Sequence, residues 1–192
     1  MPRNFHLDRT PANEMFRSEY ACDDHWIEAF LTEVREGHVG TRWDEQPFIT
    51  PVLFCYDSER REIYFHTNLV GRLKANSQHH RRACFEASRT GKLLPSNVAL
   101  EFSVQYESVI AFGDIRILEG EDEQRRALYG LLNKYFPEME SGVDYRPITD
   151  QELKRTSVYA IAIDSWSGKR NWPERAEQSP DWPALAEALL IG

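Results

Sequence analysis

The 192-residue sequence contains three cysteines, Cys22, Cys55 and Cys84, at wide and irregular spacing. This odd number supports neither a disulfide framework nor a cysteine-based metal site. Cys55 and Cys84 lie within apolar segments, where a free thiol packs as a small hydrophobic side chain. Such cysteine usage is typical of a reducing compartment, and we therefore expect a cytoplasmic protein.

Features of a membrane protein or a nucleic-acid binder are also missing. The sequence has no run of about 18 apolar residues that could form a membrane-spanning helix. The polar segment Met1–Thr10 lacks the apolar core of a secretory signal. Lysines and arginines number 23 against 31 aspartates and glutamates, so the formal net charge is −8. Because nucleic-acid phosphates need a basic face, we expect neither a nucleic acid nor a membrane as partner.

The pattern along the chain predicts one principal domain without internal repeats. Residues 1–22 are polar and irregular and are expected to form an N-terminal arm. Residues 23–170 carry the regular apolar patterns and are expected to form the domain itself. Residues 171–192 are polar again, and we expect a C-terminal tail with a short helix at Ala184–Leu190.

Apolar residues at helical spacing predict several helices. The first is expected to be capped by Asp23 or Asp24 and to end at Gly37. Further helices are expected at Gly71–Gln78, at Glu121–Phe136 and after the capping residue Thr149.

A period of two predicts about six strands. Pro51 cannot donate to a ladder, so its strand either lies at a sheet edge or faces something other than a strand. Gly113 indicates a bulge or a bend, and residues 89–97 are expected to form an exposed loop. With the main helices outside them, the strands predict a mainly β fold, a half-closed or closed antiparallel barrel. The expected strands are one from Val39, Phe48–Tyr56, Glu62–Thr67, Ala83–Ala87, Leu100–Leu118 and Thr156–Ile163.

The segment Ile63–Lys74 runs from a strand directly into a cationic turn. Gly71 permits a backbone conformation that other residues resist. Arg72 and Lys74 place two positive charges on the first turn of the helix that follows. Such a turn, with free backbone N–H groups, can hold a phosphate. The alternative is a plain strand–turn–helix junction with solvated charges, because no strict phosphate motif is present.

The histidines do not define a site by themselves. His79 and His80 are adjacent, but no third ligand is evident, so we expect a solvated surface and no metal. No Ser-His-Asp or Cys-His arrangement is legible. His66 lies in a strand beside the cationic turn, where a lone histidine is more often structural.

Four segments in a fixed order carry a family resemblance, namely Phe48–Val52, Tyr64–Leu73, Ser103–Val109 with Gly113, and Ser165–Lys169. In them the sequence resembles the FMN-binding split β-barrel family, which is related to pyridoxamine 5′-phosphate oxidase. It looks most like the Nim branch, associated with 5-nitroimidazole resistance. The resemblance implies a six-stranded antiparallel split barrel that works as a homodimer with FMN at the interface.

The resemblance also implies a flavin site. Arg72 and Lys74, with the backbone at Gly71, would hold the phosphate. His66 is implied as the catalytic residue and as a cofactor contact. The residues that would line the ring are Thr50, Pro51, Val52, Thr67 and Asn68. Contacts from the second subunit or from the end of the last strand would be Tyr106, Ser108, Trp166 and Lys169, with core packing an alternative for Tyr106 and Trp166.

These implications predict a flavin-dependent reductase of small nitro-heteroaromatic compounds, in which His66 supplies or orients protons. The alternatives are an enzyme like pyridoxamine 5′-phosphate oxidase, a non-catalytic barrel that binds FMN or haem, and a barrel without cofactor. A dimer is also expected because the sequence has more apolar side chains than one barrel interior needs. Those side chains are Phe102, Val104, Val109 and Phe112.

Overall fold

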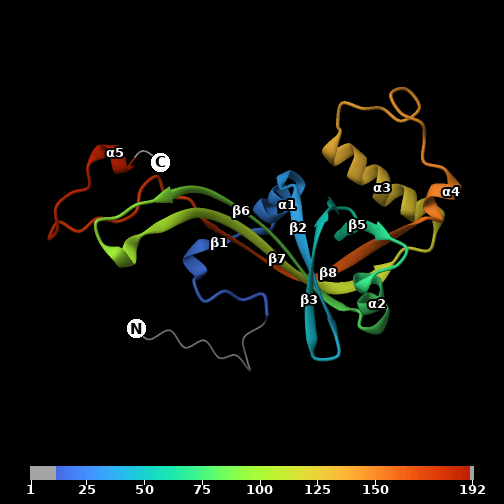
Figure 1. Ribbon diagram of the computed structural model, residues 1–192, viewed down its shortest axis with the longest axis horizontal. Helices are drawn as coiled ribbons and strands as arrows, with labels where there is room; N and C mark the ends of the chain where they lie inside the picture. The colour runs from blue at the N-terminus through green and yellow to red at the C-terminus, as the bar shows by residue number, and fades with distance from the viewer. Residues whose placement is uncertain (1–11, 191–192) are drawn as a thin grey trace.

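The computed structural model of the protein describes residues 12–190, and its main feature is one curled antiparallel sheet (Figure 1). Its strands run in the order β3-β2-β6-β7-β8-β5-β4, and the short β1 pairs with β8. The strands are β1 Ala21–Cys22, β2 Glu36–Trp43, β3 Gln46–Leu53, β4 Cys55–Asp57, β5 Glu62–Asn68, β6 Arg82–Leu94, β7 Ser103–Ile117 and β8 Thr156–Asn171. The helices are η1 Ser18–Tyr20, α1 Asp24–Glu33, α2 Arg72–His79, η2 Ala99–Glu101, α3 Glu121–Tyr135, α4 Asp150–Leu153 and α5 Glu187–Leu190.

The curl of the sheet brings its two ends together without closing them. β3 contacts β5, but no hydrogen-bonded ladder joins these two strands in the part of the chain that is described. The fold is therefore mainly β with a few helices, and a half-closed barrel of the split type, as the sequence predicted.

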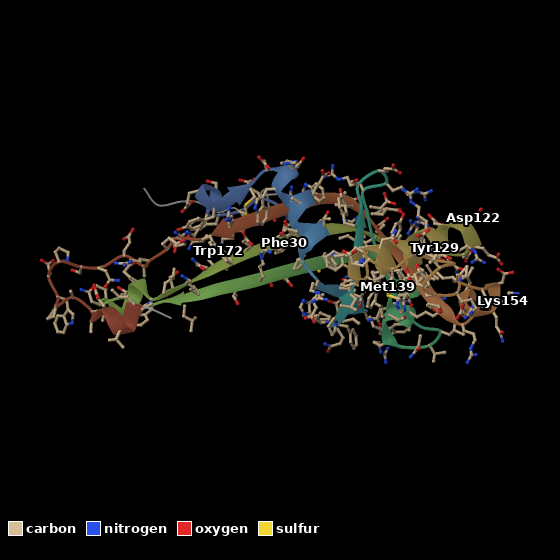
Figure 2. All side chains as sticks on the ribbon, turned by 90° about the horizontal axis from the view of Figure 1, so that it is seen from above. Phe30, Asp122, Tyr129, Met139, Lys154 and Trp172 are labelled. Atoms are coloured by element: carbon tan, nitrogen blue, oxygen red, sulfur yellow. The ribbon has the colours of Figure 1, made fainter. Side chains whose placement is uncertain are left out.

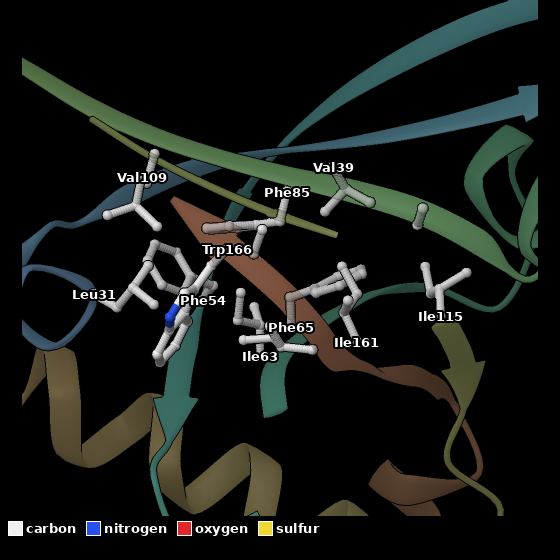
Figure 3. Close-up of a cluster of buried hydrophobic side chains, with 14 of the residues drawn as sticks. Leu31, Val39, Phe54, Ile63, Phe65, Phe85, Val109, Ile115, Ile161 and Trp166 are labelled. Carbon is white, nitrogen blue, oxygen red and sulfur yellow. The ribbon is translucent and has the colours of Figure 1, made fainter. Parts of the chain in front are cut away.

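The interior of the barrel is filled by apolar side chains from most of the strands and from α1 (Figure 3). Phe65 and Tyr159 stack with ring centroids 5.1 Å apart, and Phe54 meets Phe85 edge-on at 4.6 Å. Burying each such side chain contributes roughly 1.5–3 kcal/mol. Val109, which we expected to supply surplus apolar surface, is fully buried in this core. That expectation was wrong because Val109 faces inward from β7.

A second apolar cluster lies between the outer face of the sheet and α3. It contains Tyr64 and Val158 from the sheet and Leu131 from the helix. Both faces of the first part of β5 are therefore covered, and successive residues of this strand point alternately into the barrel and toward α3. Phe65 and His66 thus lie on opposite faces.

Strands β6 and β7 continue beyond the barrel as a long arm, with the C-terminal tail at its far end (Figure 1). The tail is fastened there by Asn97, whose amide donates to the backbone carbonyl of Ser179 at 2.9 Å. Trp172 lies along the arm (Figure 2), against Gly91, where a Cβ would come within 2.6 Å of the indole.

Several local predictions are confirmed. Asp23 caps α1 by accepting a hydrogen bond from the Trp26 N–H at 2.8 Å. Thr149 and Glu152 form the expected capping box of α4. The ladder between β7 and β8 shifts at Gly113, where a Cβ would lie 1.9 Å from the carbonyl oxygen of Ala162. No helix in residues 12–190 is long and apolar enough to cross a membrane.

Other boundaries were wrong because tertiary contacts override local patterns. The first helix ends at Glu33, and Gly37 belongs to β2, where a side chain would collide with the Phe85 ring. The strand expected over Phe48–Tyr56 is broken, because the Tyr135 hydroxyl bonds both the N–H and the carbonyl of Phe54.

Two strands extend well past their predicted ends, and β2 begins at Glu36, before the predicted Val39. The segment predicted as a loop at 89–97 instead continues β6 to Leu94, with an irregularity between Thr90 and Leu93. β8 extends to Asn171 because it pairs with β7 along its length. The last helix is shorter than expected and covers only Glu187–Leu190, since it buries no residue that could stabilise it.

Candidate functional site

The open side of β3 faces the gap at the end of the sheet. β3 is an edge strand, because β2 is its only ladder partner among the described strands. This position explains how Pro51 is tolerated. Thr50 and Val52 are half-buried, and Val52 packs against the barrel core, whereas Pro51 is exposed on the other face. The strand thus offers an unpaired backbone edge beside β5, and a flat ligand can lie against such an edge.

The start of α2 borders the same gap and is open to a ligand. Gly71 precedes the helix with φ +154°, a conformation that L side chains rarely adopt. No side chain caps the first turn of α2. A Cβ at Gly71 would meet nothing within 4 Å, so the space beside this residue is open. Uncapped N–H groups at a helix start attract anions.

Two cations stand on this first turn. The guanidinium carbon of Arg72 lies 5.3 Å from the ring centre of Phe48 in β3 and 5.8 Å from that of Trp43 in β2. Neither Arg72 nor Lys74 forms an ion pair with any described carboxylate. Since the net charge is −8, two unpaired cations beside uncapped N–H groups are a good fit for a phosphate.

The end of β5 leads into this turn. The Thr67 hydroxyl donates to the backbone carbonyl of Asn68 at 3.1 Å and lies 3.3 Å from the Tyr159 hydroxyl inside the barrel. Asn68 is exposed on the opposite face of the strand. The structure therefore brings together two parts of the predicted site. The residues in this group are Thr50, Pro51, Val52, Thr67, Asn68, Gly71, Arg72 and Lys74.

His66 lies at the mouth of a separate pocket of about 410 Å³ on the α3 side of β5. Its walls are largely apolar, and partial desolvation by burial there lowers the pKa of the His66 imidazole below its ordinary value. The pocket joins the edge of the sheet to the end of α3. Its other lining residues are Arg35, Glu36, Leu53, Leu131, Leu132, Tyr135 and Phe136.

Sequence reasoning missed these lining residues. Leu53 ends β3 and Tyr135 ends α3, and they are far apart in the chain. The Tyr135 hydroxyl brings them together by binding the backbone of Phe54. The one local signal was the aromatic pair Tyr135 and Phe136 before Pro137. This pair marks the end of an amphipathic helix but does not show which surface the helix covers.

Tyr106, Ser108 and Lys169 form a third group, on the outer face of β7 and β8. The ammonium of Lys169 lies 5.0 Å from the ring centre of Tyr106, and Ser108 pairs with Lys169 in the ladder. β7 is three strands away from β3, and on the other side of the gap Lys169 lies seven residues beyond Ala162, the last residue of β8 that pairs with β5, roughly 23 Å at the usual rise per residue. Within one chain these residues therefore do not reach the gap beside β3.

Trp166 is placed in the core. It is 6 % exposed, its indole N–H donates to Asp24 at 2.7 Å, and the guanidinium of Arg61 lies 4.2 Å from its ring centre. These contacts hold α1 against β8 and leave the indole away from the other predicted site residues.

Comparison with solved structures establishes the shared fold. The flavocytochrome Anf3 from Azotobacter vinelandii matches with a TM-score of 0.71 and 21% identity, over 85% of this chain and 74% of that one. The FAD and heme binding protein from Mycobacterium smegmatis matches with 0.69 and 21%, over 86% and 76%. A putative 5-nitroimidazole antibiotic resistance protein from Bacteroides thetaiotaomicron matches with 0.65 and 22%, over 78% and 85%.

Sequence comparison identifies the family. No curated protein matches the chain. The family model described as pyridoxamine 5′-phosphate oxidase, however, matches residues 23–170, which run from the cap of α1 to the residue before the end of β8. The chain is therefore a member of the pyridoxamine 5′-phosphate oxidase family.

Proposed function

We propose that the protein binds FMN and reduces small nitro-heteroaromatic compounds. The observation that carries the proposal is the uncapped start of α2, where Gly71 opens the turn, Arg72 lies over Phe48 of β3 and Lys74 adds a second cation to the same turn. This arrangement supplies cations and N–H donors for a phosphate and a backbone edge for the ring. The solved relatives named for flavin or for nitroimidazole resistance support the same reading.

Electron supply and proton delivery are assigned to two neighbouring places, the gap beside β3 and the pocket of His66. Bound flavin would supply electrons, and the protein's own groups would bind the substrate and deliver protons. Among the titratable residues that line the pocket of about 410 Å³, His66 is the one whose ordinary pKa lies near neutral pH, and the pocket has a size that suits a single small heteroaromatic ring. Nitro reduction consumes protons as well as electrons, and an imidazole at that position would donate them to the substrate.

Reconstitution with cofactors tests the proposal. The purified chain is mixed with FMN, FAD, riboflavin or haem, desalted, and examined by absorbance. We expect retained flavin bands near roughly 370 and 450 nm with FMN, weaker retention of riboflavin, and nitroreductase activity with a chemical or nicotinamide donor. Retention of haem alone would overturn the proposal in favour of a haem protein. Retention of no cofactor would leave a structural barrel, and turnover of pyridoxamine 5′-phosphate would indicate an oxidase.

We further propose that the working unit is a homodimer. Tyr106, Ser108 and Lys169 lie too far from β3 to share its site within one chain, and a second copy can bring them there. Exposed apolar side chains support such a contact, because neighbouring ones form patches that favour burial in a partner, as Leu93 and Phe102 do on the arm. The most exposed on the arm and on β3 are Leu100 (88%), Leu93 (76%), Ile49 (74%), Phe102 (61%) and Leu53 (55%).

Analytical ultracentrifugation at micromolar concentration measures this assembly. We expect a mass of twice 22.4 kDa. Phe102→Glu and Ile49→Glu should each shift the protein toward monomer and reduce FMN retention together with it, whereas Val143→Glu, at an exposed loop residue, should change neither. A wild-type monomer that retains FMN would contradict a shared site.

A further inference from the structure

The turn between β2 and β3 meets the end of α2 in a cluster of potential metal ligands. Asp44 in the turn, and His79 and His80 at the end of the helix, each place a ligand atom within 4.8 Å of the others. None of the three residues lines the pocket of His66, and they belong to no group described above. The sequence showed the two histidines but hid the carboxylate, because only folding places Asp44 beside them.

Interactions within the cluster hold its members in place. His79 Nε2 lies 2.9 Å from Asp44 Oδ1, and the His79 ring stacks on Trp43 at 4.3 Å. The rings of His79 and His80 meet edge-on at 4.4 Å. Asp44 has φ 49°, a left-handed conformation that aspartate and asparagine adopt more readily than most residues. The turn therefore presents its carboxylate toward the helix.

His80 adds a second observation that points to a ligand. Its Nε2 atom is buried and has no hydrogen-bond partner among the described residues. A buried ring nitrogen without a partner is costly, and metal coordination is one way to satisfy the lone pair of a neutral imidazole. Both histidines also lie at the C-terminal end of α2, where the helix dipole favours a positive charge.

We propose that Asp44, His79 and His80 bind one divalent transition-metal ion. Two imidazoles and one carboxylate suit Zn²⁺ and its neighbours and do not suit Mg²⁺ or Ca²⁺, which prefer oxygen ligands. Ligand atoms around a tetrahedral zinc ion lie about 3.4 Å apart at metal–ligand distances of about 2.1 Å. Small side-chain rotations of the exposed His79 and Asp44 close the remaining difference from 4.8 Å.

Such an ion would fasten the tip of the β2–β3 hairpin to α2. The other end of α2 already contacts the same hairpin, since Arg72 lies over the rings of Trp43 and Phe48. With the ion bound, both ends of the helix are tied to β2 and β3. The site is thus a structural clamp, and its free coordination positions are open to solvent or to a further ligand.

Calorimetric titration of the full chain with ZnCl₂, after dialysis against a chelator, tests this site. We expect one saturable Zn²⁺ per chain and a higher melting temperature with the ion, and no such effect with MgCl₂. Asp44→Asn keeps a residue that tolerates the left-handed turn, and His79→Ala and His80→Gln each remove one imidazole. Each variant should lose about 10-fold or more in Zn²⁺ affinity, as removal of groups that support a metal ligand already does.

His38→Ala is the matched control. His38 Nδ1 lies 3.0 Å from Glu86 Oε2, so it forms a histidine–carboxylate pair of similar geometry without a second histidine. We expect its Zn²⁺ affinity to equal that of the wild type. Absence of saturable binding, or binding that survives all three variants of the cluster, would overturn the proposal and assign any bound zinc to another site. Melting curves without metal verify that each variant is folded.

Discussion

Replacing Arg72 and Lys74 together by alanine is expected to weaken FMN binding by about 100-fold or more and to leave riboflavin binding nearly unchanged. A charge-assisted hydrogen bond typically contributes about 1.5–3 kcal/mol, and tenfold in affinity corresponds to about 1.4 kcal/mol. Two such bonds, partly screened by solvent, account for a loss of this size. Riboflavin lacks the phosphate, so it loses none of these contacts.

The measurement is fluorescence quenching of both flavins by the wild type and the variant. Arg60→Ala with Arg126→Ala is the control, because it also removes two exposed cations but at the turn before β5, the opposite end of that strand from Gly71. This control should bind both flavins as the wild type does. If the double variant at Arg72 and Lys74 lost affinity for FMN and riboflavin equally, the phosphate would lie elsewhere and the effect would be on folding or on the ring.

Local patterns predicted most of this fold. The period of two marked the strands, and Asp23 and Thr149 marked helix starts correctly because caps are satisfied within a few residues. The boundaries failed where distant residues decide. Gly37 leaves room for the Phe85 ring, with which a larger side chain would collide. The backbone N–H of Phe54 donates to the Tyr135 hydroxyl and does not continue the strand ladder. Neither contact has a signature in the neighbouring sequence.

The candidate site could likewise be predicted only where its residues are contiguous in the sequence. The strand, turn and cations from Thr67 to Lys74 are contiguous, so the sequence alone could place them together. The approach of β3 to β5 depends on the curl of the whole sheet, and the pocket of His66 depends on where α3 ends. Asp44 and His79 show the same limit, because a two-residue turn and a helix end meet only in the folded chain.

Replacing His66 by alanine is expected to slow reduction of a nitro-heteroaromatic substrate by about 10²–10⁴-fold, the usual contribution of a general acid or base. FMN affinity and melting temperature should change little, since His66 lies on the face of β5 opposite Phe65 and the barrel core. The three quantities are measured on one preparation. His25→Ala, which removes an exposed histidine of α1, is the control and should leave all three unchanged.

The pH profile distinguishes a proton donor from a residue that only shapes the pocket. Burial lowers the pKa of His66 below its ordinary value of 6.5, so the imidazolium is lost at a lower pH than in free histidine. If the imidazolium is the donor, the wild-type rate falls as pH rises through this lowered pKa, and the fall begins below about pH 6.5. His66→Ala should show no such fall, and an unchanged profile in the variant would assign the proton to water or to another residue.

The same shift makes a second, independent readout available. A histidine whose pKa is lowered by folding binds its proton more readily in the unfolded chain. Its neutral form therefore supports the folded state fully above about pH 6.5, and that support is lost as the pH falls through the lowered pKa. His66→Ala should remove this part of the acid sensitivity of melting, whereas its rate defect should be largest at low pH and should shrink as the pH rises through the lowered pKa. A variant that melts with wild-type acid sensitivity but reduces slowly would place His66 in solvent and leave its catalytic role intact. If His66→Ala reduces the substrate at the wild-type rate, His66 has no catalytic role.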